Sequence, residues 1–204
     1  MCNSTNKTQI ILASASGTRQ KILSEAGVSF DTVPSLIDEE FIKTECIKDG
    51  DNAGEIAMAL ASRKALSVSV MYPEKLVIGA DQVLEFNGQA FSKPKNTNMA
   101  IKQLKELRGN VHYLINSVSL AIGGCQTWSY TVKCKMKMRN VSDTYIKWYI
   151  GKVGHKALET PGSYQIEGLG IQLFEELTGD HSSILGLPLL PLLNFLRDRK
   201  YIKS

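Results

Sequence analysis

Hydrophobic and polar residues alternate with two different periods along the chain, which predicts strands and helices in mixed order. Residues 10–13 and 76–80 are short apolar runs, typical of strands that are buried on both faces. Residues 112–122 and 126–138 meet at Gly123-Gly124, a hairpin signal, and the second arm alternates strictly. Residues 28–33 are also predicted to be extended. These segments predict a mixed sheet with an antiparallel second half.

Apolar residues at helical spacing predict five helices with turn or capping residues at their ends. They cover residues 19–26, 55–70, 97–107, 143–149 and 189–199. The acidic residues 38–40 are predicted to form a loop, and the glycine-rich residues 161–187 to form loops and strands lining a pocket. We therefore expect one α/β domain over residues 1–204, a mixed twisted sheet with helices on its faces and a cleft between two lobes.

The composition predicts a soluble globular protein and argues against a nucleic-acid-binding protein. The 204 residues are 43% hydrophobic, which is sufficient for a core. The net charge of +4 is spread along the chain without a basic arm, so an anionic small ligand explains it better than nucleic acid. Basic residues do alternate with apolar ones between Tyr130 and Arg139, as expected on the solvated face of a strand.

The cysteines and the apolar segments indicate a cytoplasmic protein. Cys2, Cys46, Cys125 and Cys134 are far apart and never form a Cys-x-x-Cys pair, which argues against a zinc site and a disulfide scaffold. Residues 1–9 lack an apolar signal core, and the longest apolar stretch, 184–196, is interrupted by prolines. We expect no export signal and no membrane span.

Two segments carry candidate chemistry. Asp81 follows the apolar run 76–80 and precedes Lys93 by twelve residues, an arrangement that suits a metal-bound phosphate at the carboxyl end of a strand. An ordinary aspartate between a strand and a turn is the alternative interpretation.

The second segment, residues 10–19, is an apolar strand that runs into small hydroxyl residues, a glycine and an arginine. Ser14, Ser16 and Thr18 can donate hydroxyl hydrogen bonds to an anion, and Gly17 allows the backbone to approach it closely. A helix that begins near Arg19 would direct free N–H groups at a phosphate. A simple Ser/Thr helix cap is the alternative. The pattern is not a Walker motif, and Gly168-Leu169-Gly170 lacks the third glycine of a dinucleotide fingerprint.

Taken in order, several motifs resemble the Maf family of nucleoside triphosphate pyrophosphatases, also described as septum-formation inhibitors. Residues 12–19 match the family signature Leu-Ala-Ser-x-Ser-Pro-x-Arg, with glycine in place of proline. The other matching segments are 37–39, 62–65, 79–82 with 93–94, and 164–168 with 186–189. The resemblance therefore covers nearly the whole chain.

The resemblance implies an elongated α/β fold shared with inosine triphosphatase-like enzymes, with a nucleoside triphosphate in the central cleft. The implied reaction gives the monophosphate and pyrophosphate. Asp81 matches the proton acceptor that activates water, and Glu39, with Asp81, is implied to hold Mg²⁺ or Mn²⁺. The implied phosphate-neutralising residues are Ser14, Arg19, Lys64 and Lys93. Oxygen ligands suit these metals better than zinc, and phosphoryl chemistry requires such cations.

Three positions bear on the substrate. Gln82 and Glu167 match the branch of the family that acts on 7-methyl-GTP, whereas the branch acting on TTP and UTP usually has Thr and Gln there. Thr18 matches neither branch, since these tend to have Trp or Arg. A carboxylate at position 167 can accept paired hydrogen bonds from guanine and balance a cationic methylated ring. A solvent-facing acid is the alternative.

Two other functions agree with the sequence. Thr18 leaves a pyrophosphatase for TTP or UTP possible, and the family description allows a nucleotide-binding regulator of cell division. A homodimer is plausible by resemblance, with Trp128, Trp148 and the C-terminal helix as candidate surfaces. Each of these is also a common core element.

Overall fold

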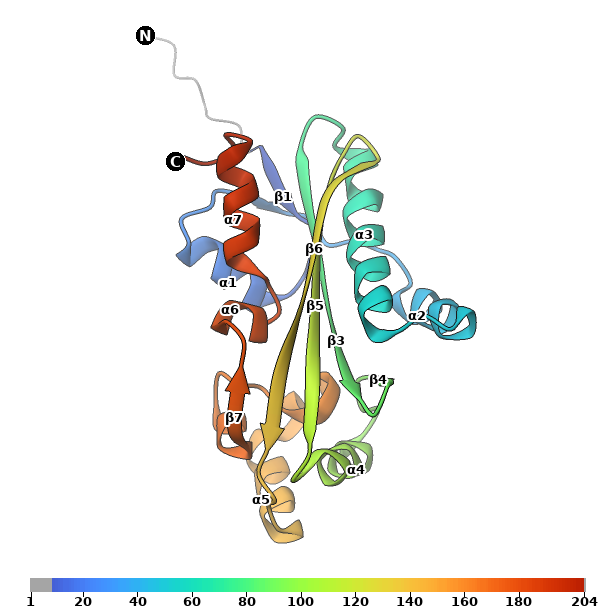
Figure 1. The fold of residues 1–204 in the computed structure, drawn as a ribbon, viewed down its shortest axis with the longest axis vertical. Helices are drawn as coiled ribbons and strands as arrows, with labels where there is room; N and C mark the ends of the chain where they lie inside the picture. The colour runs from blue at the N-terminus through green and yellow to red at the C-terminus, as the bar shows by residue number, and fades with distance from the viewer. Residues whose placement is uncertain (1–8, 204) are drawn as a thin grey trace.

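The computed structural model describes residues 9–203 and shows an elongated molecule built on one twisted, mixed sheet (Figure 1). The strand order is β2-β1-β3-β5-β6-β7, and β4 pairs with β3. β1 is parallel to β2 and β3, and the other pairs are antiparallel. The strands are β1 (Ile10–Leu12), β2 (Asp31–Thr32), β3 (Leu76–Phe86), β4 (Gln89–Phe91), β5 (Val111–Ile122), β6 (Cys125–Met138) and β7 (Phe174–Thr178).

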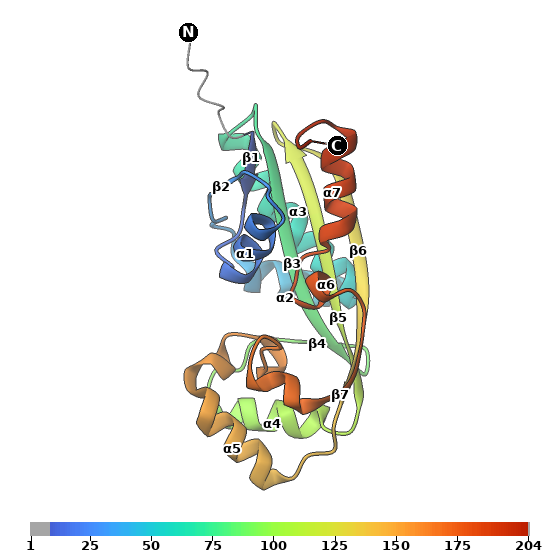
Figure 2. The same ribbon diagram turned by 90° about the vertical axis from the view of Figure 1, so that its left-hand side faces the viewer.

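Helices cover both faces of the sheet near the chain termini and gather at the opposite end of the long strands (Figure 2). The α-helices are α1 (Gly17–Glu25), α2 (Glu39–Asp49), α3 (Ala53–Met71), α4 (Thr97–Leu107), α5 (Asp143–Val153), α6 (His181–Ile184) and α7 (Leu189–Asp198). Three 3₁₀ turns, η1 (Gly154–Leu158), η2 (Pro161–Ser163) and η3 (Leu169–Leu173), follow α5. α3 packs on one face of β3 and β5, and α1 and α7 lie on the other (Figure 1).

The alternation of side chains along β3 explains how one strand serves two helical layers. Leu76, Ile78 and Ala80 join a cluster with residues of α1 and α7. Val77 points to the opposite face, where it packs with residues of α3. Farther along the strand, Leu84 belongs to a separate core with α4 and α5. β3 therefore passes from one lobe into the other.

Several predictions from the sequence are confirmed. The mixed twisted sheet, the five expected helices and the hairpin through Gly123-Gly124 are present, within a few residues of the predicted bounds. Asn96 caps α4, because its Oδ1 accepts a hydrogen bond from the Met99 amide at 3.0 Å. Within β6, buried Cys134, Met136 and Met138 alternate with basic residues, as expected for a strand with one solvated face.

Residues 28–33, predicted to be extended, contain the two-residue strand β2, which pairs with β1. Two other local predictions are wrong. The strand expected to end at Ala80 continues to Phe86, so Asp81 lies in the middle of β3 and not at its carboxyl end. The continuation pairs with β4 and β5, which satisfies its backbone although polar Asp81 and Gln82 interrupt the apolar run.

The acidic residues 38–40 do not form a loop. Asp38 caps α2, its Oδ1 accepting from the Phe41 amide at 2.9 Å, and Glu39 and Glu40 form the first turn. Carboxylates in a first helical turn interact favourably with the helix dipole, which explains why an acidic run can begin a helix.

Three cysteines, Cys46, Cys125 and Cys134, have free thiols, while Cys2 lies outside the described residues, as does most of the segment judged to lack a signal core. Over residues 9–203, no helix is both long and apolar enough to cross a membrane.

Trp128 packs on Phe195 of α7, and Trp148 is 43% exposed beside Tyr145. Homodimerisation stays a prediction.

Candidate active site

A cleft of about 700 Å³ lies where the two lobes meet, at the middle of β3. Its walls come from the β1–α1 turn, α2, α3, β3, the segment after β4 and the η1–η2 region. All of the predicted site residues except Glu167 line it: Ser14, Thr18, Arg19, Glu39, Lys64, Asp81, Gln82 and Lys93. The expectation of a central cleft between two lobes is confirmed.

A buried ion pair forms the centre of the cleft. Lys64 Nζ lies 2.6 Å from Asp81 Oδ1 and 2.9 Å from Glu39 Oε1, so one ammonium joins residues of α3, β3 and α2. Lys64 and Asp81 are buried, whereas the Glu39 side chain is 53% exposed. Lys64 thus faces the cleft and contacts both predicted carboxylates.

Gly79 allows this contact. It lies two residues before Asp81, on the same face of β3, and faces α3. A Cβ at this position would lie 2.2 Å from the carbonyl oxygen of Ala61 and 2.6 Å from the amide nitrogen of Ala65. The backbone of α3 therefore approaches β3 closely enough for Lys64 to reach Asp81.

The β1–α1 turn forms a second polar wall. Ser14 Oγ accepts hydrogen bonds from the Ser16 amide at 3.2 Å and from Arg19 Nη1 at 3.3 Å. Arg19 Nε donates to the carbonyl of Gly186 at 2.9 Å, which fixes the guanidinium against the α6–α7 connection. Burial lowers the pKa of Arg19, and the nearby carboxylates of Asp81 and Glu39 oppose that shift.

The expected substrate-reading residues are held by contacts of their own. Gln82 Nε2 donates to Asn116 Oδ1 at 2.8 Å and to the Ile184 carbonyl at 3.0 Å. Both protons of that amide are thereby used, and its oxygen is the group that can serve a ligand. Glu167 lies outside the cleft lining and is exposed, but its Oε2 accepts a hydrogen bond from Thr18 Oγ1 at 3.2 Å.

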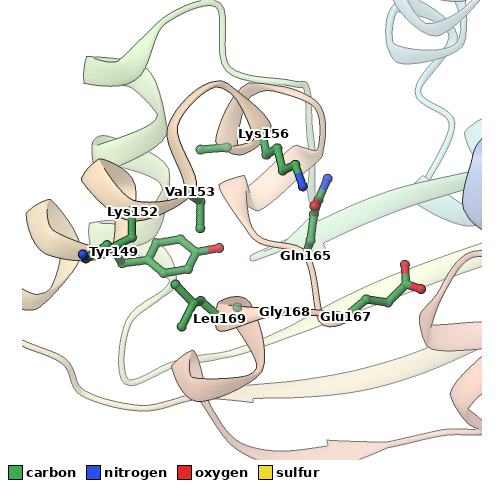
Figure 3. A pocket seen from close by; sticks show the side chains of 10 residues that line it. Tyr149, Lys152, Val153, Lys156, Gln165, Glu167, Gly168 and Leu169 are labelled. Atoms are coloured by element: carbon green, nitrogen blue, oxygen red, sulfur yellow. The ribbon is translucent and has the colours of Figure 1, made fainter.

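Glu167 lines a second, smaller cavity of about 270 Å³ beside α5 (Figure 3). Tyr149, Val153 and Leu169 supply apolar surface, and burial raises the pKa of Tyr149 to about 12. Gln165 lines both cavities, so the second one adjoins the central cleft.

Comparison with known proteins assigns the chain to a family. Residues 9–199 match the family described as Maf-like protein. The chain belongs to the Maf family. A relative from Rhodopseudomonas palustris, named nucleoside triphosphate pyrophosphatase, is 43% identical over 193 residues, 95% of each chain.

Two further Maf relatives are named 7-methyl-GTP pyrophosphatase. The protein from Brucella abortus is 41% identical, covering 95% of this chain and 98% of its own, and that from Rhizobium etli is 38% identical, covering 93% and 96%. A solved dITP/XTP pyrophosphatase from Mycobacterium abscessus covers 94% of this chain with a TM-score of 0.41 and 12% identity. Because this TM-score is low, the fold described above is taken from the structure of this Maf protein alone.

The cleft of this Maf protein contains a cation that the sequence did not single out. Lys43, on α2, is buried, and its Nζ donates to the carbonyl of Phe91 at 3.0 Å and to Ser92 Oγ at 2.8 Å. It lies four residues after Glu39, a spacing that places both on one helix face. This spacing has meaning only within a helix, and the sequence predicts a loop at residues 38–40, where α2 begins. Lys93, in contrast, is exposed on the segment after β4.

The donor set of the cleft fits a divalent metal held partly by substrate. Among residues 9–203, no three acidic, histidine or cysteine side chains form a metal-binding group. Asp81 and Glu39 nevertheless both approach Lys64, so their carboxylates already converge on one positive charge. Mg²⁺ is typically bound by one or two carboxylates together with substrate phosphates, which agrees with this pair.

Proposed function

We propose that this protein hydrolyses a nucleoside triphosphate to the monophosphate and pyrophosphate. The observation that carries the proposal is the buried Asp81 carboxylate, held by Lys64 in a cleft that also contains Arg19 and Ser14. A carboxylate next to converging phosphate-binding groups is what attack by water on a phosphoryl centre requires. Relatives covering nearly the whole chain are named nucleoside triphosphate pyrophosphatases, which supports the same reaction.

In the proposed mechanism, Asp81 accepts a proton from water as the water oxygen attacks the α-phosphorus. Lys64 engages Oδ1, and we assign the water to Oδ2. The bond between the α-phosphorus and the bridging oxygen breaks, and pyrophosphate leaves with the electron pair. Lys64, Lys93 and Arg19, with the Ser14 hydroxyl, stabilise the phosphate oxygens. When Asp81 and Glu39 hold Mg²⁺ or Mn²⁺, the metal adds charge neutralisation.

The finer proposal is that the substrate carries a modified guanine, as in 7-methyl-GTP, and that the reaction removes such nucleotides from the pool in the cytoplasm. Glu167 supplies the carboxylate suited to a cationic purine, and Thr18 donates to that carboxylate. Two relatives at about 40% identity carry the corresponding name. The regulator hypothesis is not favoured, because the relatives are named as enzymes.

The first test is pyrophosphate release from canonical and methylated nucleoside triphosphates, with Mg²⁺, Mn²⁺ or a chelator. We expect metal-dependent release, fastest with 7-methyl-GTP, and loss of release with the chelator. Preference for TTP or UTP would overturn the proposed substrate but would agree with the proposed reaction. Absence of turnover with every triphosphate would overturn the reaction.

Substituting Glu167→Gln isolates the base-reading step. The exposed carboxylate receives a hydrogen bond from Thr18 and makes no ion pair with another described residue, so the substitution should leave folding unchanged. We expect kcat/KM for 7-methyl-GTP to fall by about tenfold or more, since a hydrogen bond to a charged group contributes about 1.5 to 3 kcal/mol. The value for unmethylated triphosphates should change less.

The matched control is Glu175→Gln, which neutralises an exposed carboxylate on β7 outside both cavities. An equal loss of kcat/KM for every triphosphate in Glu167→Gln would show that the residue does not read the base.

A further inference from the structure

Lys43 is a buried cation that the proposed chemistry does not yet use. Its side chain extends from α2 to the end of β4 in the wall of the cleft, and the residue is 9% exposed. It lines the cleft with Lys64, Asp81 and Lys93. The lysine thus connects the helix that carries Glu39 to the segment that carries Lys93.

The contacts of Lys43 do not balance its charge. Its two hydrogen-bond partners are neutral oxygens, the Phe91 carbonyl and the Ser92 hydroxyl. Burial lowers its pKa, and Glu40 and Asp81 oppose that shift. No carboxylate in the described chain lies within ion-pair distance of its ammonium. A buried charge of this kind is unfavourable unless a counter-ion completes its surroundings.

A neutral donor would tie α2 to β4 equally well and without that penalty. The positive charge therefore needs another explanation, and the cleft in which it lies is the one that takes a triphosphate in the proposed function. An ammonium has three donor protons, and two are used by Phe91 and Ser92, so one is left for a further acceptor.

We propose that Lys43 is a phosphate-binding residue, which together with Lys93 forms the subsite for the pyrophosphate part of the substrate. This inference rests on the proposed function and adds a residue to it. The ligand class is a polyphosphate anion, and inorganic pyrophosphate, the product of the reaction, is its simplest probe. Lys43 keeps its contacts to Phe91 and Ser92 and donates its third proton to a phosphate oxygen.

The test is calorimetric titration of inorganic pyrophosphate with Mg²⁺ into the full chain, for the wild type and Lys43→Gln. We expect the Kd of the variant to rise by about tenfold or more, as for loss of a charge-assisted hydrogen bond. The dependence of Kd on salt should also weaken, because one charge is removed from the site. Thermal unfolding of each protein checks that it remains folded.

Two controls separate the charge from other effects. Lys48→Gln removes a charge from the same helix at an exposed position paired with Glu45, and should bind pyrophosphate as the wild type does. Ser92→Ala removes the hydroxyl that Lys43 contacts and keeps the ammonium. If Lys43 acts through its charge, Ser92→Ala retains most of the affinity. If it only ties down the segment after β4, Ser92→Ala loses affinity as Lys43→Gln does.

The outcomes distinguish this inference from the proposed function. The inference is overturned if Lys43→Gln binds pyrophosphate as tightly as the wild type does, or if Lys43→Gln and Ser92→Ala lose affinity equally. In either case, turnover of a triphosphate by the wild type would still support the proposed reaction. Turnover by a wild type that binds no pyrophosphate would also contradict the subsite. A wild type that neither turns over triphosphates nor binds pyrophosphate would overturn both.

Discussion

Replacing Asp81 by Asn is expected to reduce pyrophosphate release by about 100-fold or more, the usual effect of removing a general base. Asn is nearly the same size as Asp and can still accept a hydrogen bond from Lys64, but it cannot take a proton from water. Steady-state kinetics with the preferred triphosphate measures the effect. We expect the loss in kcat, with a smaller change in KM, because Asp81 acts on water more than on the bound phosphates.

The control is Glu85→Gln, which neutralises a carboxylate four residues farther along β3, where it pairs with Lys133 outside the cleft. Its turnover should equal that of the wild type. Thermal unfolding of Asp81→Asn is needed beside the kinetics, since removing one partner of a buried pair also destabilises the fold. A folded Asp81→Asn protein with full turnover would refute the role of Asp81 as proton acceptor.

Substituting Gly79→Ala should disrupt both the fold and the site. The added Cβ would lie 2.2 Å from the Ala61 carbonyl oxygen, closer than two such atoms can approach, so α3 must move away from β3. Overpacking of this kind lowers the free energy of unfolding by about 1 to 3 kcal/mol, occasionally more. Turnover should fall as well, because the helix that moves carries Lys64. Urea unfolding and steady-state kinetics measure the two effects.

Gly151→Ala is the matched control for Gly79→Ala. Gly151 lies within α5 and is exposed, and a Cβ there would meet no atom within 4 Å. Alanine in a helix interior is more favourable than glycine by about 0.5 to 1 kcal/mol, so this variant should be as stable as the wild type or more stable. Equal stability of Gly79→Ala and the wild type would show that α3 and β3 tolerate a wider separation.

The hairpin and the helices could be predicted because their signals are local. Gly123-Gly124 marks a tight turn between alternating segments, and Asn96 provides a cap directly before a helical pattern. Asp81 could be singled out as a candidate, and it does line the cleft, but its place within the strand could not be predicted. In the sequence, polar residues that interrupt a strand look the same as polar residues that follow its end. Only the pairing of Asp81 and Gln82 with β5 shows that the strand continues through them.

The whole of α2 and the position of Lys43 in the cleft were missed for a related reason. α2 has little amphipathic character, since Phe41 and Ile47 are exposed on it, so hydrophobic periodicity does not reveal it. The convergence of Lys43 on β4 joins residues 48 positions apart in the sequence, and no spacing within one element encodes that contact. The sequence therefore indicates which residue types suit phosphate chemistry, whereas their arrangement in space requires the structure.

The continuity of β3, β5 and β6 has a mechanical consequence. β3 and β5 pair without interruption from Val77 to Glu85, across the level of the cleft. Because no loop interrupts this pairing, any bending of one lobe toward the other has to deform the paired strands together, so the sheet provides no flexible linker between the lobes. We therefore expect nucleotide capture and product release to depend mainly on segments attached to the sheet, such as the β1–α1 turn and the segment after β4. We expect those segments to set the pace of turnover, while the distance between the lobes stays nearly constant.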